Sequence, residues 1–221
     1  MSHELVFPDP RAAADLLTFA GRAARLSDPA VRLRAASGVM AVSTAPLSPR
    51  GFGEETPTVL AMRFVHTDPE LECDLVVDAG ALRAGGEGRV ALPDSGISAA
   101  WAGISPPRSG WLRVGELATG AMREVARRGV DEVARMLPAN PGEDVVRSVR
   151  SAVWGRTDAA LLATPAGAAF AADAMGFLGG EEPVGVHRTG TWTRLSMQRG
   201  HVLVRAGNPT GLTAVRTTGG R

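Results

Sequence analysis

The chain has 221 residues, of which 44% are hydrophobic and 21% charged, so it is long and apolar enough to bury a core as one good-sized domain or two small ones. The formal net charge is +1, and all 24 basic residues are arginine. The absence of lysine excludes Schiff-base and pyridoxal phosphate enzymes, P-loop proteins and protein kinases, which each use a lysine amine.

The single cysteine, Cys73, limits the chemistry further. It excludes an internal disulfide, Cys-rich zinc modules and the usual four-cysteine iron–sulfur clusters. Apolar runs stay short of the roughly 20 residues that span a bilayer, and the first ten residues lack the pattern of a secretory signal. We therefore expect a cytoplasmic protein without a membrane contact, and no cofactor is predicted. Abundant Ala, Gly and Arg without lysine is typical of a high-GC bacterium.

The first half of the chain predicts one helix followed by strands. Asp9-Pro10 has the pattern of an N-cap before a first-turn proline, and apolar residues then recur at helical spacing to about residue 26. Apolar residues next alternate with arginine or acidic residues, which is the period of a half-buried strand. Strands are expected over 31–35, 39–44, 59–65 and 71–77, with shorter ones over 89–92 and 97–102. A turn at 66–69 suggests that 59–65 and 71–77 form a hairpin.

The second half predicts helices and then strands. The helical period returns at Val114 and continues to residue 137, with an interruption near Gly129. A further helix is expected over 142–154, and Thr164-Pro165 is typical of the start of another that runs to about 178. The C-terminal strands are expected over 185–188, 191–196 and 201–205.

This order of elements predicts an α+β fold rather than alternating βαβ units. We expect an antiparallel sheet mainly from the first half, a helical middle over about 114–178, and C-terminal hairpin strands that join the sheet or form a small one. The organisation predicted is a single domain over 1–206, with a sub-division near residue 112, and a loosely ordered tail over 207–221.

The first candidate site is the segment from Trp101 to Trp111, in which two tryptophans flank Pro106-Pro107-Arg108. An arginine can stack on an indole ring while its guanidinium receives an anion or a carboxylate. Alternatively, both rings anchor the passage from sheet to helices and the prolines stiffen it, which is the commoner use of such aromatics. The segment is nevertheless our first choice for a functional surface.

The second candidate is the C-terminal strand region, which holds six arginines and no acidic residue after position 182. Its candidate residues are His187, Arg188, Trp192 and Arg194, followed by Arg199, His201 and Arg205. Basic side chains beside an aromatic could bind phosphates. We favour the alternative of a charged strand edge that prevents aggregation, because a pI near 8.1 lies below the usual basic signature of nucleic-acid binders.

Two further motifs carry weaker signals. His66, Cys73 and the acidic residues between and beside them offer metal ligands, but strand alternation sends Cys73 to the opposite face from Glu72 and Asp74. Those acids instead suit pairing with Arg32 and Arg34 across the sheet. The run 96–100 approximates a nucleophile elbow around Ser98, although the preceding Pro93-Asp94-Ser95 makes a poor strand. Because alternation separates Cys73 from the neighbouring acids, no metal site is predicted.

The sequence resembles an uncharacterised actinobacterial protein family in three segments, which are Trp101–Trp111, 187–195 and 199–205. The resemblance covers most of the chain. It implies a bacterial cytoplasmic protein and assigns no activity, ligand or catalytic residue.

The sequence leaves three functional hypotheses. The favoured one is a non-catalytic binding or interaction protein that uses the Trp101–Trp111 loop to contact a protein or a small molecule. The second is a hydrolase-like enzyme acting on small molecules through Ser98 or a histidine. The third is nucleic-acid binding through the C-terminal arginines, which the weak basic signature does not favour.

Overall fold

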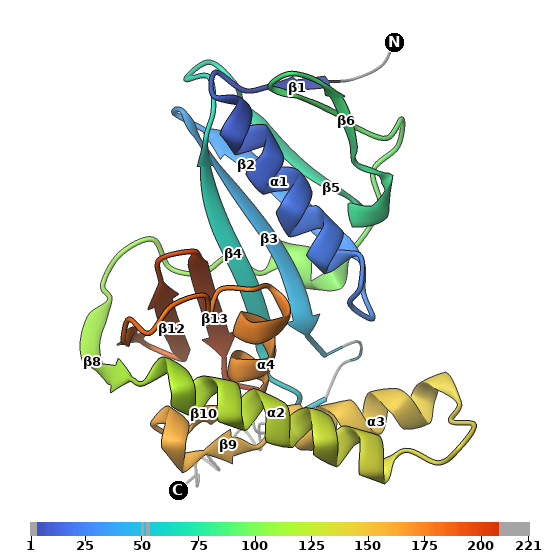
Figure 1. Cartoon of the computed structure of the whole chain (residues 1–221), viewed down its shortest axis with the longest axis vertical. Coiled ribbons are helices and arrows are strands. Elements are labelled where there is room, and N and C mark those ends of the chain that lie inside the picture. Colours follow the sequence, from blue (N-terminus) through green and yellow to red (C-terminus); the bar gives the residue numbers. More distant parts are fainter. Residues whose placement is uncertain (1–3, 50, 52–53, 208–221) are drawn as a thin grey trace, which may run out of the picture.

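The computed structural model describes residues 4–49, 51 and 54–207, and its central feature is one antiparallel sheet of eight strands. Their order across the sheet is β5-β2-β3-β4-β13-β12-β11-β8. Their bounds are β2 Ala30–Ala36, β3 Val39–Leu47, β4 Thr58–His66, β5 Cys73–Asp78, β8 Leu112–Leu117, β11 Val184–Thr189, β12 Trp192–Met197 and β13 Gly200–Arg205. Four strands come from each half of the chain, and the pairing of β4 with β13 joins the halves (Figure 1). The predicted α+β fold is thus confirmed, and the C-terminal strands join the sheet.

Four α-helices lie against the sheet or at its lower end in Figure 1. They are α1 Pro10–Ala23, α2 Thr119–Met136, α3 Glu143–Trp154 and α4 Gly167–Ala174. Helix α1 begins as the sequence predicts, because the Asp9 side chain accepts a hydrogen bond of 2.9 Å from the backbone N–H of Arg11, and Pro10 needs no such partner. Its buried stripe, which includes Leu16 and Phe19, faces the sheet.

The main core lies between the helices and one face of the sheet. Because side chains alternate along a strand, every second residue of β4 faces this core, as Val59, Ala61 and Val65 do. Leu33 of β2 and Val186 of β11 join the same cluster, which therefore runs through both halves of the chain. The residues that alternate with these core residues along each strand face the other side of the sheet, outside this core.

Small elements complete the fold. A three-stranded sheet has the order β1-β7-β6 and a two-stranded one pairs β9 with β10. These strands are β1 Glu4–Val6, β6 Arg83–Gly86, β7 Arg89–Ala91, β9 Thr157–Asp158 and β10 Thr164–Pro165, and short 3-10 turns occupy Ala79–Ala81, Ala100–Gly103 and Ala159–Leu161. Most of the tail predicted over 207–221 lies outside the described residues.

The predicted hairpin of 59–65 with 71–77 is wrong. Strand β5 crosses to the edge of the sheet and pairs with β2, while β4 lies between β3 and β13. Opposite charges favour this pairing, since it sets Asp74 directly across from Arg34 and next to Arg32. The turn chemistry at 66–69 was correctly located, but a turn fixes only a reversal of the chain and not the neighbouring strand.

The predicted helix start at Val114 is also wrong, because Leu112–Leu117 forms β8 and pairs with β11. In so short a run the apolar residues fit both periods. Helix α2 then continues through Gly129 without the predicted interruption. Gly129 serves packing instead, since a Cβ there would overlap the ring of Trp154. Helix α4 starts after Pro165 because Pro165 belongs to β10 and pairs with Thr157 of β9.

Candidate functional site

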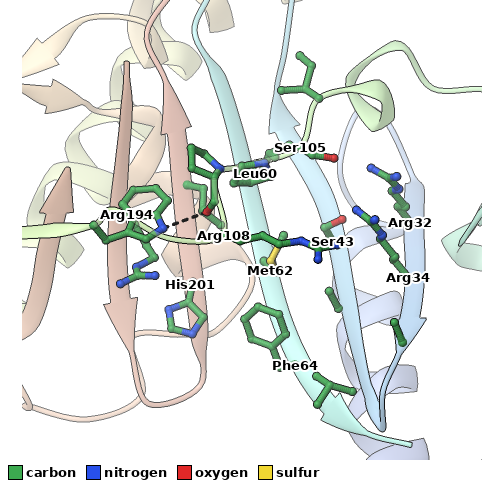
Figure 2. A pocket seen from close by; sticks show the side chains of 18 of the residues that line it. Arg32, Arg34, Ser43, Leu60, Met62, Phe64, Ser105, Arg108, Arg194 and His201 are labelled. Atoms are coloured by element: carbon green, nitrogen blue, oxygen red, sulfur yellow. Dashed lines mark hydrogen bonds between the residues drawn. The ribbon is translucent and has the colours of Figure 1, made fainter. Parts of the chain in front are cut away.

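A groove of about 510 Å³ lies on the face of the sheet that the helices leave uncovered. Strands β2, β3, β4, β13 and β12 form its floor, and the loop over 104–111 runs along one side (Figure 2). Leu60, Met62 and Phe64 of β4 supply most of the apolar floor together with Leu203 of β13. They are the alternate residues that point away from the helix-side core, so the same alternation that builds the core also builds the groove.

Strand pairing fixes how the groove side chains follow one another. One row across four strands consists of His201, Met62, Ser43 and Arg32, each directly opposite the next. In the neighbouring row Arg194 lies opposite Leu203, which lies opposite Leu60. The groove therefore has apolar residues in the middle and arginines at both ends.

The segment from Trp101 to Trp111 is held by its two tryptophans in different ways. Trp101 is only 3% exposed, packs in a small apolar cluster with Leu60 and Leu203, and donates its indole N–H to Asp28 at 3.2 Å. Trp111 is half-buried and donates its indole N–H to the carbonyl of Pro107 at 3.0 Å. Trp101 is thus an anchor, whereas Trp111 offers part of its ring to the groove.

At the β2 end of the groove, two arginines share one carboxylate. Arg32 binds Asp74 through Nε and Nη2, both at 2.7 Å, and also donates to the carbonyl of Ala102. Arg34 lies 3.8 Å from the same carboxylate. The hydrogen bonds to Arg32 lower the pKa of Asp74 and raise that of Arg32, so both stay charged. The predicted pairing of these arginines with a β5 acid is confirmed.

At the β12 end, Arg194 lies over the ring of Trp111 with its Cζ 4.7 Å from the ring centroid. Burial lowers the pKa of Arg194. Its Nε is buried and has no hydrogen-bond partner within the described part of the chain. Arg108 is exposed and reaches from the loop across the groove (Figure 2).

Two histidines flank Arg194. His201 lines the groove, where its Nδ1 lies 3.2 Å from the Ser196 hydroxyl and its ring contacts Phe64 edge to face at 5.7 Å. His187 lies opposite Arg194 on β11, outside the groove. Burial, followed by repulsion from Arg194, lowers the pKa of both imidazoles, so both favour the neutral form.

The structure brings most of the sequence-predicted residues to one place. Trp101, Pro106, Pro107, Arg108, Trp111 and Arg194 all line the groove. Arg188 instead donates to the carbonyl of Leu162 on another part of the surface, and Trp192 is 7% exposed in the apolar cluster beneath the loop. The two candidate regions of the sequence therefore meet, because Arg194 stacks on Trp111.

Sequence reasoning missed the apolar floor, and Phe64 in particular. Phe64 is 51% exposed, which is unusual for so large an aromatic side chain on an inner strand of a sheet. Its outward position in an alternating strand was a usable signal. Nothing in the sequence, however, indicates that β4 and β13 are neighbours and bring Leu60 beside Leu203.

The weaker motifs do not form sites. The residues around Ser98 lie in an irregular segment, without the strand before and the α-helix directly after that a nucleophile elbow needs. Among the described residues no group of three or more His, Cys, Asp or Glu could hold a metal ion. Cys73 lies 3.8 Å from the carbonyl of Leu33, and burial raises the pKa of its thiol. None of the helices in the described ranges is long and apolar enough to cross a bilayer.

Comparison with solved structures identifies the fold as similar to bacterial DNA polymerase III beta subunits. A chain from Eubacterium rectale, provisionally described as such a subunit, superposes with a TM-score of 0.50 and 8% identity over 95% of this chain and 66% of its own. Caulobacter crescentus pol III beta gives 0.47 and 12% identity over 93% and 65%. The Pseudomonas aeruginosa DNA polymerase sliding clamp gives 0.46 and 12% identity over 95% and 66%. The chain thus spans just under two thirds of the length of these proteins.

Comparison with family models divides the chain in two. Residues 1–103 match a domain of unknown function, DUF8010, and residues 106–209 match another, DUF8185. No curated protein matches the chain in sequence. The actinobacterial origin that the resemblance implies stays a prediction. Each half of the chain is thus similar to a domain of unknown function, and the predicted resemblance to an uncharacterised protein family is confirmed.

Proposed function

We propose that the chain is a non-catalytic interaction protein whose groove binds a short, extended segment of a partner protein. The observation that carries this proposal is the exposed apolar floor beneath a stiff Pro-Pro loop. Phe64 is 51% exposed and Met62 only partly covered, although both lie on β4, an inner strand of the large sheet. Apolar surface gathered in a concave site is typical of places where partners bind.

The dimensions of the groove suit a peptide segment. From β12 to β2 it crosses five neighbouring strands. At about 4.8 Å between strands this is about 19 Å, the length of about six residues of extended chain. The likeness of the fold to a chain provisionally described as a DNA polymerase III beta subunit supports an interaction role, because a subunit of an assembly contacts other proteins.

Nucleic acid is a second candidate, and the fold weakens the sequence-based expectation against it. The observation in its favour is that Arg32, Arg34, Arg108 and Arg194 line the groove together with aromatic rings. Binding of single-stranded DNA that falls steeply with salt concentration and is lost in Arg108→Ala would support this candidate.

Selection from a random peptide library on the immobilised full chain tests the main proposal. We expect enriched peptides whose affinity falls about tenfold or more in Phe64→Ala, because an anchoring aromatic is removed from the site. Leu112→Ala is the matched control, since Leu112 is 72% exposed but lies on β8, outside the groove. Equal loss in both variants, or enrichment of peptides that bind Phe64→Ala unchanged, contradicts the proposal.

A further inference from the structure

We propose that the groove selects segments with acidic side chains, whose carboxylates pair with Arg108 and Arg194. This inference rests on the proposed function and names the class of partner. The first observation behind it is the charge of the groove. Every charged residue that lines it, in the part of the chain that the structure describes, is an arginine.

The four arginines are not equivalent. Arg32 and Arg34 already share the carboxylate of Asp74, which lies on β5, the strand next to β2 at the edge of the sheet. Arg194 has the face of Trp111 as its neighbour, and Arg108 has no hydrogen bond or ion pair with any described residue. Two guanidinium groups therefore remain open toward the groove.

The surroundings of Arg194 argue most directly for a carboxylate. Its Nε is buried and unpartnered, and the groups that face it are Trp111 and the two histidines, none of which is an acid. Burying an N–H donor of an arginine without a hydrogen-bond acceptor is unfavourable. A carboxylate can satisfy the planar fork of an arginine with two hydrogen bonds while the ring of Trp111 holds the guanidinium plane in place.

The position of Arg108 adds a second point of contact. Arg194 lies on β12, whereas Arg108 reaches from the loop over the middle of the groove (Figure 2). The two guanidinium groups therefore lie at different places along the groove. A chain terminus supplies only one carboxylate, so two separate guanidinium groups favour acidic side chains within the segment. Apolar residues between them would contact Met62 and Phe64.

An acidic peptide fits the groove better than nucleic acid does. Sequence-independent nucleic-acid binding depends on several phosphate contacts. Of the described arginines that line the groove, only Arg108 and Arg194 lack an ion pair. The floor between them is apolar, with Leu60, Met62 and Leu203. Apolar side chains with flanking carboxylates match that pattern.

The test uses the full chain and C-terminally amidated peptides, so that only side-chain carboxylates are present. The strongest library-selected peptide is compared with a version in which each Asp and Glu is replaced by Asn and Gln, and with one in which they are replaced by lysine. We expect the amide version to bind about tenfold more weakly or worse. In Arg108→Glu we expect the order to reverse, with the lysine peptide binding better than the acidic one. Arg135→Glu, an exposed arginine of α2, is the matched control and leaves the order unchanged.

Any of four results would overturn the inference. Equal affinity of the acidic and amide peptides would refute acidic selection while leaving peptide binding in the groove intact. A preference for peptides with a free C-terminal carboxylate would show that a chain end, not a side chain, is recognised. Displacement of the acidic peptide by single-stranded DNA at lower concentration would assign the arginines to nucleic acid. Enrichment of no peptide at all would refute the proposed function as well.

Discussion

The two faces of the large sheet are built from the same strands and differ in almost every other respect. The helix-side face is covered, and Leu33, Val59 and Val186 are fully buried there in the same cluster as Trp154. The other face carries a loop, arginines and a half-exposed phenylalanine. Alternation along a strand produces both faces without any extra sequence length. Stability therefore resides mainly on one face of the sheet, which leaves the other face free to bind.

The largest expected effect of a substitution lies on the helix side. Trp154 is 1% exposed and stacks on Phe170 with ring centroids 4.6 Å apart. Replacing it with alanine leaves a large cavity, and we expect a loss of about 3–5 kcal/mol in the free energy of unfolding. Urea denaturation followed by circular dichroism measures this loss. A change below about 1 kcal/mol would mean that the helix side does not dominate stability.

The next effect concerns the ion pair at the β2 edge of the groove. Asp74→Asn removes a half-exposed pair with Arg32, and we expect a loss of about 1 kcal/mol or less at neutral pH. Because Arg32 lowers the pKa of Asp74 in the folded state, the contribution is present above the unfolded carboxyl pKa and disappears as pH falls through the folded one. Denaturation at neutral pH and near pH 2 should show a difference only at neutral pH. A difference that persists in acid would assign the loss to packing.

A smaller effect is expected from His201. Its pKa is lowered, mainly by burial, so the folded state favours the neutral ring and stability falls as pH drops below the unfolded value of about 6.5. His201→Gln should flatten this part of the pH profile of stability. His187 titrates in the same direction, so some slope should remain. An unchanged profile in the variant would mean that neither burial nor Arg194 disfavours the protonated ring of His201.

The smallest change in stability is expected where binding should change most. Phe64 contacts His201 but is half exposed, so Phe64→Ala should alter the free energy of unfolding by no more than about 0.5 kcal/mol. The same urea titrations check this value. A loss of several kcal/mol would place Phe64 among the structural residues and remove the contrast between the faces.

Local patterns in the sequence predicted the fold class and part of the groove. Asp9-Pro10 marked the start of α1, and the alternation of Arg32 and Arg34 with apolar residues predicted β2 and its acidic partner. The loop with Trp111 was the preferred site from its composition alone, and it does line the groove. These features were predictable because each depends on residues close together in the chain.

Long-range neighbours could not be predicted in the same way. The groove exists because β4 lies beside β13, which sets Leu60 next to Leu203 although most of the chain separates them. The contact of Arg194 with Trp111 depends on the same arrangement, since residues 104–111 must cross the outer face of the sheet to bring Trp111 to Arg194 of β12. The turn residues at 66–69 likewise could not show that β5 would pair with β2 instead of β4.

Chemical-shift mapping of the full, isotope-labelled chain with the strongest library-selected peptide tests whether the groove is the binding site. We expect shifts concentrated in β4, β13 and residues 104–111, including the indole N–H of Trp111 and the side chains of Arg108 and Arg194. Shifts concentrated on the opposite face, in α2 and α3, would show that the groove is not the binding site and would contradict the proposed function.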